Sequence, residues 1–391
     1  MKDDELQILG KEQRLGKRKK WHKILFAVVA VVLALGGLWL CSQDKSNVRT
    51  TLVPELQAAT DYLLNEELET IDGLQGQVIV MRVETGEILS MVGRERRFDG
   101  KFQPCENFGY QQEPGSVMQT AALLAMLETG KVKLEDEVDT GSGVWNIDSI
   151  SMKDHNWHRG GYGKITLASA LKNSSNIGIS KTVRKVFRGN EKSYFELLDN
   201  MSFGQPSTVD GIDELNPMIC SSMKDSASAS RQMLWNAVGY ERKMAPLQIL
   251  TFYNAIANNG RMVMPMLHQA PVTVINEQIA SKENIAKMQH LLYEVVTDGT
   301  AKMAKTSLTS VAGKTGTATV KDISINEDAS IHEYHVLFCG YFPAEAPKYS
   351  VIVSLNKQGL PASSASMAGV VFRKIAEWLT QNEECVLQKS K

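Results

Sequence analysis

Apolar segments of strand length occur in two places, near the beginning of the chain and near its end. The early pair, residues 78–83 and 87–92, is joined by Glu84-Thr85-Gly86, a short stretch that is typical of a hairpin turn. The later strand patterns are residues 311–320, 334–342 and 349–355. The economical interpretation is one sheet in which strands from the two ends of the chain lie together.

Helical patterns fill much of the remaining chain. Residues 116–260 are mainly helical in pattern, and they include a well-marked helix at 245–258 with Pro246 in its first turn and Gly260 after its end. Further helices are expected at residues 52–64, 283–296 and 364–379. This order predicts an α/β fold in which terminal helices cover one face of the sheet and a large helical insertion, about 115–260, lies beside it.

An uncharged apolar segment lies at residues 24–41. Its 18 residues reach the lower limit for a membrane-spanning helix, and a cluster of Lys and Arg precedes it without a comparable cluster after it. The positive-inside rule therefore places the N-terminus in the cytoplasm. We expect a cytoplasmic tail at 1–23, a transmembrane helix at 24–41, a linker at 42–50 and a domain outside the membrane at 51–385.

Two other interpretations of the apolar segment are a cleaved signal peptide and a lipidated Cys41. The apolar run is long for a signal peptide and no A-x-A cleavage site follows it. Leu40 is a poor residue to precede a lipoprotein cysteine. A retained anchor is the interpretation that the sequence favours.

Composition excludes some functions. The chain has 391 residues and a formal net charge of −1, so no general affinity for nucleic acid is expected. Its five cysteines lack CxxC or zinc-ligand spacing; Cys41 lies at the membrane edge, and a single disulfide among the other four stays open. Histidine clusters at 155–158 and 332–335 have spacings that suit a metal, but no third ligand converges on either of them. We therefore expect neither a metal nor a cofactor.

The segment Lys314-Thr315-Gly316-Thr317 has the character of a binding strand. On a strand, Thr315 and Thr317 point to one face, and Lys314 and Gly316 to the other. A glycine within a strand lets another backbone approach closely, and hydroxyl groups near a cation can hold a carboxylate. An ordinary Lys-Thr-Gly turn is the alternative, and the triplet alone does not decide between them.

Two further polar motifs precede this strand. The turn Glu113-Pro114-Gly115-Ser116 leads into a helical pattern, so Ser116 lies where free backbone N–H groups and the helix dipole stabilise negative charge. Ser174 and Asn176 follow at another predicted helix start. Each motif alone also suits an inert helix cap. Together with Lys314, in this order, they supply what serine acyl transfer needs: a nucleophile, a proton-transfer group and a substrate strand.

With these motifs in place, the sequence resembles the transpeptidase domain of the penicillin-binding proteins, closest to the membrane-anchored class B type. Further similar blocks lie at residues 86–92, 239–248, 257–260, 298–301 and 340–343. The resemblance covers roughly residues 50–380. It implies the penicillin-binding-protein/serine β-lactamase-like fold, an antiparallel sheet flanked by terminal helices with a large helical subdomain, here preceded by one transmembrane helix.

The resemblance also implies roles for individual residues. Ser116 would be the acylated nucleophile, and its backbone N–H group and that of Thr317 would form the oxyanion hole. Ser174 would pass a proton to the leaving group, with Lys314 as its electrostatic partner, and Asn176 would hold the substrate amide. The substrate-binding positions would be Thr315, Gly316 and Thr317.

Two features depart from the family pattern. The nucleophile motif of the family is Ser-x-x-Lys, whereas this chain has Ser116-Val117-Met118-Gln119. Position 119 lies one helical turn after the serine and faces it, and a glutamine there cannot take up a proton near neutral pH. The second departure is the short linker at 42–50, where class B proteins usually carry a large module.

The implied function is acyl transfer from peptidoglycan stem peptides that end in D-Ala-D-Ala, with β-lactams binding at the same site. The expected location is the cytoplasmic (inner) membrane of a bacterium, and other cell-wall synthesis proteins are expected partners. Gln119 favours an alternative, a catalytically inactive scaffold or regulator that keeps the substrate groove. A carboxypeptidase, and a β-lactamase or antibiotic sensor, are further alternatives that the long similar blocks favour less.

Overall fold

The computed structural model describes residues 49–147, 150–205, 209–210, 212, 218–219, 226–326 and 329–387. The predicted cytoplasmic tail, the predicted transmembrane helix and residues 42–48 of the predicted linker lie outside these ranges. None of the helices within them has both the length and the apolar character needed to cross a bilayer. The chain divides into two units, Met1–Thr50 and Thr51–Lys391, and the second unit carries the features described below.

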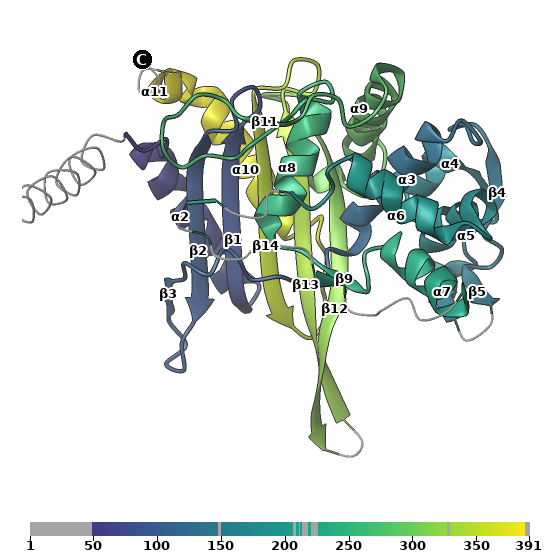
Figure 1. Cartoon of the computed structure of the whole chain (residues 1–391). Helices are drawn as coiled ribbons and strands as arrows, with labels where there is room; N and C mark the ends of the chain where they lie inside the picture. The colour runs from purple at the N-terminus through teal and green to yellow at the C-terminus, as the bar shows by residue number, and fades with distance from the viewer. Residues whose placement is uncertain are drawn as a thin grey trace, which may run out of the picture. The chain divides into compact units, whose positions relative to one another are not determined.

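One antiparallel six-stranded sheet forms the framework of this unit (Figure 1). Its strands, in spatial order, are β12 (Ala312–Asn326), β13 (Ala329–Phe342), β14 (Tyr349–Gln358), β1 (Gly73–Arg82), β2 (Ile88–Arg96) and β3 (Phe102–Pro104). Strand β1 pairs with β2 on one side and with β14 on the other, so that Val80 lies between Ser90 and Val351. The prediction that strands from both ends of the chain share one sheet is confirmed.

Helices pack on both faces of the sheet, and the apolar side chains of β1 alternate between them. Val78 and Val80 belong to one hydrophobic cluster with residues of α2 (Pro54–Thr70) and α10 (Ala368–Gln381). Ile79 and Met81 belong to a second cluster with residues of α8 (Pro246–Ala257). Figure 1 shows α8 across the front of the sheet and α10 behind it. The terminal helices therefore share one face, as the sequence predicts.

The helical insertion lies beside the β12 edge of the sheet (Figure 1). Its central helix, α3 (Met118–Glu128), is buried at every position from Met118 to Leu127, because neighbouring helices surround it. The other helices within the predicted bounds are α4 (Leu167–Lys172), α5 (Asn176–Phe187), α6 (Glu191–Asn200) and α7 (Ser226–Asn236), and α9 (Lys282–Thr297) packs against α3 from beyond them. Helix α8 lies within the predicted bounds of the insertion but packs on the sheet. Short ladders join β4 (Glu137–Asp139) to β7 (Lys164–Thr166), β5 (Val144–Ile147) to β6 (Ile150–Lys153), β8 (Met218–Ile219) to β9 (Arg242–Lys243), and β10 (Met262–Val263) to β11 (Val274–Asn276).

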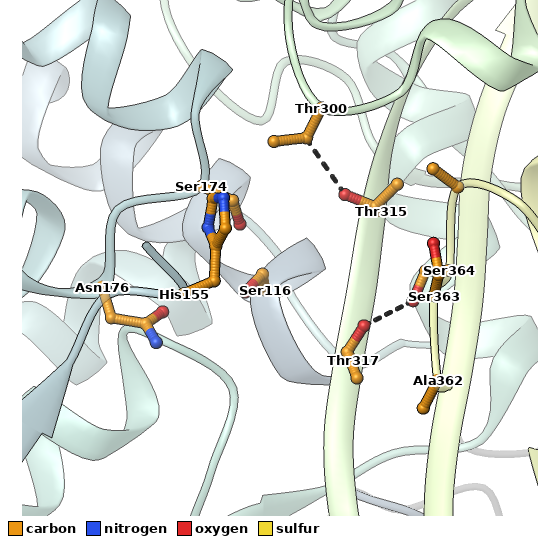
Figure 2. Close-up of a pocket in the computed structure, with 11 residues that line it drawn as sticks. Ser116, His155, Ser174, Asn176, Thr300, Thr315, Thr317, Ala362, Ser363 and Ser364 are labelled. Atoms are coloured by element: carbon orange, nitrogen blue, oxygen red, sulfur yellow. Dashed lines mark hydrogen bonds between the residues drawn. The ribbon is translucent and has the colours of Figure 1, made fainter. Parts of the chain in front are cut away.

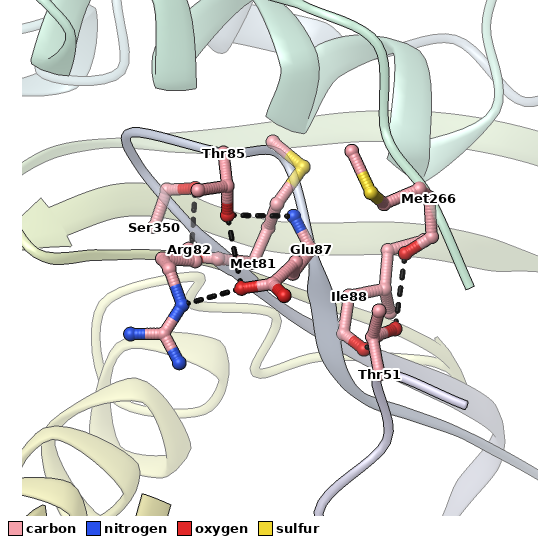
Figure 3. A network of polar contacts seen from close by, with 8 residues as sticks. All are labelled: Thr51, Met81, Arg82, Thr85, Glu87, Ile88, Met266 and Ser350. Atoms are coloured by element: carbon pink, nitrogen blue, oxygen red, sulfur yellow. Dashed lines mark hydrogen bonds and ion pairs between the residues drawn. The ribbon is translucent and has the colours of Figure 1, made fainter. Parts of the chain in front are cut away.

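A polar network fixes the start of the unit to the sheet (Figure 3). The hydroxyl group of Thr51 donates to the carbonyl oxygens of Ile88 at 2.7 Å and Met266 at 3.1 Å. Glu87 forms a parallel bridge with Met266 and an ion pair with Arg82 at 2.7 Å. The first residues of the unit, the β1–β2 turn and the segment after α8 are thereby joined, although they are far apart in the sequence.

Several element ends differ from the sequence prediction, among them the first helix, which is expected to end at residue 64 and ends at Thr70. The last helix begins at Ala368 and not at residue 364, because the Ser364 hydroxyl group bonds to the carbonyl oxygen of Gly316 in β12. Residues 364–367 form a turn in its place. Strands β12 and β13 also extend beyond the predicted apolar stretches into a long hairpin whose sequence is polar.

Candidate active site

The turn that carries Ser116 lies directly against the edge strand β12. Ser116 is part of a short 3-10 turn, Gly115–Val117, that leads into α3. Gly115 has a φ of +60°, and a Cβ atom there would lie only 2.6 Å from the carbonyl oxygen of Thr317. A Cβ atom on Gly316 would likewise lie 2.6 Å from the carbonyl oxygen of Pro114. Both glycines are needed because turn and strand meet backbone to backbone.

His335 on β13 holds this turn from the sheet side. Its Nδ1 atom lies 3.0 Å from the carbonyl oxygen of Glu113, and its Nε2 atom lies 2.7 Å from Ser354 Oγ. Complete burial lowers the pKa of His335 to about 4, so the ring is neutral at physiological pH. The neutral ring can then donate through Nδ1–H to the carbonyl group and accept the Ser354 proton at Nε2.

Ser174 lies in the tight turn between α4 and α5, where its φ of +55° is unusual for a residue other than glycine. Asp154 holds this turn in place. The carboxylate of Asp154 accepts hydrogen bonds from Ser175 Oγ at 2.8 Å and from the Ile177 backbone N–H at 3.0 Å. Burial raises the pKa of Asp154, and these hydrogen bonds oppose the shift by stabilising the charged form.

Lys314 reaches Ser174 from β12. Its Nζ atom donates to Ser174 Oγ at 2.8 Å and to the carbonyl oxygen of Thr315 at 3.1 Å. The side chain is fully buried, and burial lowers the pKa of Lys314 to about 7. The amine is therefore close to half-protonated at neutral pH, unlike an ordinary surface lysine.

Gln119 connects three polar side chains of the site, Ser116, Ser174 and Asn176. Its Nε2 atom donates to Asn176 Oδ1 at 2.9 Å and to Ser116 Oγ at 3.4 Å. Its Oε1 atom accepts the hydroxyl proton of Ser174 at 3.2 Å. The sequence prediction that position 119 faces the serine is confirmed. The carboxamide organises the site but has no basic atom to offer near neutral pH.

These groups open onto a cavity of about 470 Å³ (Figure 2). Its lining consists of Ser116, His155, Ser174, Asn176, Thr300, Thr315, Thr317 and residues 362–365. Thr317 Oγ1 lies 2.6 Å from Ser364 Oγ, and Thr315 Oγ1 lies 3.3 Å from Thr300 Oγ1. Thr315 and Thr317 thus face the cavity, whereas Lys314 lies behind Ser174 and Gly316 offers its carbonyl oxygen to Ser364.

Several lining residues are not among the sequence-predicted site residues. Thr300 lies in the block at 298–301 that resembles the family, and that resemblance is the one signal that could have pointed to it. The sequence draws attention to His155 only through a metal-like spacing; its ring lies at the cavity, with Nε2 3.1 Å from the Tyr162 hydroxyl group. No sequence signal identifies residues 362–365, because only the folded sheet brings them to Thr317.

A family model described as the penicillin binding protein transpeptidase domain matches residues 76–377 of the chain. That match covers more than half of the chain, and the chain therefore belongs to this family. Among solved structures, the apo transpeptidase domain of penicillin-binding protein 3 from Burkholderia pseudomallei matches with a TM-score of 0.70 and 22% identity, over 85% of this chain and 96% of that one. Penicillin-binding protein 2B from Streptococcus pneumoniae matches with a TM-score of 0.73 and 19% identity, over 86% and 60%.

Sequence relatives carry names from the same family. Penicillin-binding protein PbpB of Mycolicibacterium smegmatis is 25% identical over 383 residues, which cover 88% of this chain and 56% of the relative. The peptidoglycan D,D-transpeptidase FtsI of Buchnera aphidicola subsp. Schizaphis graminum is 24% identical, over 85% of this chain and 57% of the relative. The peptidoglycan D,D-transpeptidase MrdA of Acinetobacter baumannii is 25% identical, over 81% and 53%. The chain thus spans somewhat more than half the length of these relatives.

Proposed function

We propose that the chain is a D,D-transpeptidase-type serine acyltransferase that acts on peptidoglycan stem peptides in cell-wall synthesis. The observation that carries this proposal is the hydrogen-bonded network in which Gln119 joins Ser116, Ser174 and Asn176, with Lys314 bonded to Ser174. A nucleophile at a helix start, a proton-transfer pair and a substrate strand thus meet at one cavity. The membership of the family supports the same conclusion.

In this proposal Ser116 attacks the carbonyl carbon of the penultimate D-Ala. The backbone N–H groups of Ser116 and Thr317 stabilise the oxyanion, which is consistent with the close approach of the Gly115 backbone to Thr317. The hydroxyl groups of Thr315 and Thr317 bind the terminal carboxylate, and the Asn176 amide holds the substrate amide. A β-lactam presents an analogous carbonyl and carboxylate and would acylate the same serine.

The alternative of a catalytically inactive scaffold gains no support from the relatives. FtsI and MrdA are both named as peptidoglycan D,D-transpeptidases. Gln119 changes how the serine is activated, while the other polar groups of the site keep an arrangement that acyl transfer can use. We assign Ser116, Ser174, Asn176 and Lys314 to catalysis, and Thr315, Gly316 and Thr317 to the substrate strand.

The same proposal includes a membrane location. Residues 24–41 would form a single transmembrane helix, with residues 1–23 in the cytoplasm and the domain at 51–385 outside. A helical subdomain at about 115–260 would form one wall of the site. A reporter fused after Lys391 that works only outside the membrane should be active, and activity of a cytoplasmic reporter there would contradict both the location and the substrate.

The experiment that tests the activity uses the full chain in detergent with a stem peptide ending in D-Ala-D-Ala. We expect release of the terminal D-Ala, and transfer of the peptide to an added amine acceptor, in the wild type. Ser116→Ala is the matched control, since it removes one oxygen atom and leaves the fold intact. Equal release by both proteins, or no release by either at any substrate concentration, would contradict the proposal.

A further inference from the structure

The nucleophile of this site has no proton acceptor on its own helix. Gln119 occupies the neighbouring turn, and its carboxamide cannot act as a base near neutral pH. The Nε2–H group of Gln119 donates to Ser116 Oγ, so that a lone pair of Ser116 is engaged on this side. The hydroxyl proton of Ser116 must therefore point toward another acceptor in the cavity.

We propose that Lys314, acting through the hydroxyl group of Ser174, takes up the Ser116 proton during acylation and returns it to the leaving group. The inference rests on the proposed function. Its basis is geometric: Lys314 Nζ lies 2.8 Å from Ser174 Oγ, and Gln119 holds Ser174 by Oε1 and Ser116 by Nε2 on the same carboxamide. Gln119 thereby serves as the template that keeps the two serines at one cavity.

The step balances with one proton. Ser116 Oγ forms a bond to the carbonyl carbon while its proton passes to Ser174 Oγ. The Ser174 hydroxyl group, which donates to Gln119 Oε1 in the resting site, turns its own proton to the neutral amine of Lys314. When the bond from carbon to the leaving nitrogen breaks, the ammonium group of Lys314 returns a proton through Ser174 to that nitrogen. The pair ends in its starting state, and Ser116 is acylated.

The surroundings of Lys314 allow a neutral amine. Burial alone lowers the pKa of Lys314 to about 7. The acidic residues of the neighbouring helix α9 do not counter this, because Glu294 and Asp298 pair with Lys172 at 3.5 and 3.9 Å. His155 also lines the cavity; desolvation lowers the pKa of His155, the charge of Asp154 opposes this shift, and the positive charges of Arg159 and Lys314 add to it.

His155 is the one titratable side chain among the described residues that line the cavity, and it is the competing acceptor. Its ring is turned toward a different partner. Both ring nitrogens lie near the Tyr162 hydroxyl group, Nε2 at 3.1 Å and Nδ1 at 3.4 Å, and this hydroxyl group donates to the Asn173 carbonyl oxygen. The structure shows no hydrogen bond between His155 and either serine in the described part of the site. Ser174, in contrast, shares the Gln119 carboxamide with Ser116 and is bonded to Lys314, so these contacts favour Lys314 with Ser174.

The test is the pH dependence of acylation of the full chain by a fluorescent penicillin, measured from about pH 5.5 to about pH 9. We expect the second-order rate constant to rise about tenfold per pH unit below pH 7 and to level off above it, since the neutral amine is the active form. Ser174→Ala and Lys314→Met should slow acylation by about 10²–10⁴. The exposed Lys305, just before β12, provides the matched control Lys305→Met, which should keep the wild-type profile.

A second comparison separates the proton route from structural damage. Gln119→Lys places an amine beside Ser116. The decrease in acylation rate caused by Ser174→Ala should therefore be at least about tenfold smaller in that background than in the wild type. An equal cost in both backgrounds would contradict the route. A wild-type rate constant that does not change around pH 7 would also contradict the route. The same holds if the rise of the rate constant below pH 7 is lost in His155→Gln. Absence of wild-type acylation at every pH would contradict the proposed function as well, whereas the other outcomes leave it standing.

Discussion

Replacing Lys314 by methionine should make the folded protein more stable while it slows acylation. Methionine has a similar length and no charge, and it fills the same buried space between β12 and Ser174. The wild-type side chain is costly because an ammonium group loses its hydration when it is buried. The catalytic lysine at position 314 therefore lowers the stability of the folded protein.

The magnitude follows from the change in pKa. Burial lowers the pKa of Lys314 from 10.5 to about 7, and at ~1.4 kcal/mol per unit the charged form costs ~5 kcal/mol. Because the folded amine can release its proton, the cost is ~4 kcal/mol at pH 7. It falls to ~2 kcal/mol at pH 9, where the proton of an unfolded lysine is removed more easily. Methionine gives up two hydrogen bonds, to Ser174 and to the Thr315 carbonyl group, worth ~1 kcal/mol each. The net gain is ~2 kcal/mol at pH 7 and close to zero at pH 9.

The sign of the pH dependence is a further check. Between pH 7 and pH 10.5 the unfolded state binds more protons at this lysine than the folded state does, so wild-type stability rises with pH. Equilibrium unfolding in urea of wild type and Lys314→Met at pH 7 and pH 9 measures the difference directly. A variant less stable than the wild type at pH 7, or a difference that does not change with pH, would refute this reasoning.

Three further outcomes are expected. Gln119→Lys should raise the rate of acylation by a β-lactam by about tenfold or more, because it supplies a base beside Ser116; an unchanged or lower rate would count against an intact site. In the Ser116→Ala background, Thr315→Val should weaken binding of a D-Ala-D-Ala peptide by about 1.5–3 kcal/mol in calorimetry, and equal affinities would exclude Thr315 as a carboxylate ligand. The folded pKa of His335, about 4, lies below its ordinary value of 6.5, so its stabilising contribution is present above pH 6.5 and is lost as the pH falls through 4, by up to ~3 kcal/mol. His335→Gln should lack this slope in unfolding experiments, and parallel curves for the two proteins would show that His335 titrates normally.

The strands and helices with strong apolar patterns are predictable from the sequence. The early hairpin, the three late strands and the helix at Pro246–Ala257 occur where the patterns place them, because burial of these side chains decides both pattern and structure. Element ends depend on contacts that the sequence does not display. Ser364 delays the start of the last helix through a bond to Gly316, and the extension of β12 and β13 has only a short apolar alternation, at Ile323 and Ile325, among polar residues.

The candidate site is predictable in its motifs and not in its connections. Order and spacing suggest that Ser116, Ser174 and Lys314 act together, yet only the fold shows Gln119 bonded to both serines and to Asn176. The wall formed by residues 362–365 depends on the packing of a loop against the edge strand, a long-range contact without a local signature. The low pKa of Lys314 depends on burial, and burial at a single polar position cannot be read from a sequence.

The central claim is that Ser116 forms an acyl-enzyme. Its most direct test is to incubate the full chain with a β-lactam for an extended period and then determine the intact mass and the modified peptide. We expect one added β-lactam per chain, located on the peptide that contains Ser116, and no addition to Ser116→Ala. A chain that gains no mass at saturating β-lactam, or a Ser116→Ala variant that gains the same mass as the wild type, would contradict it.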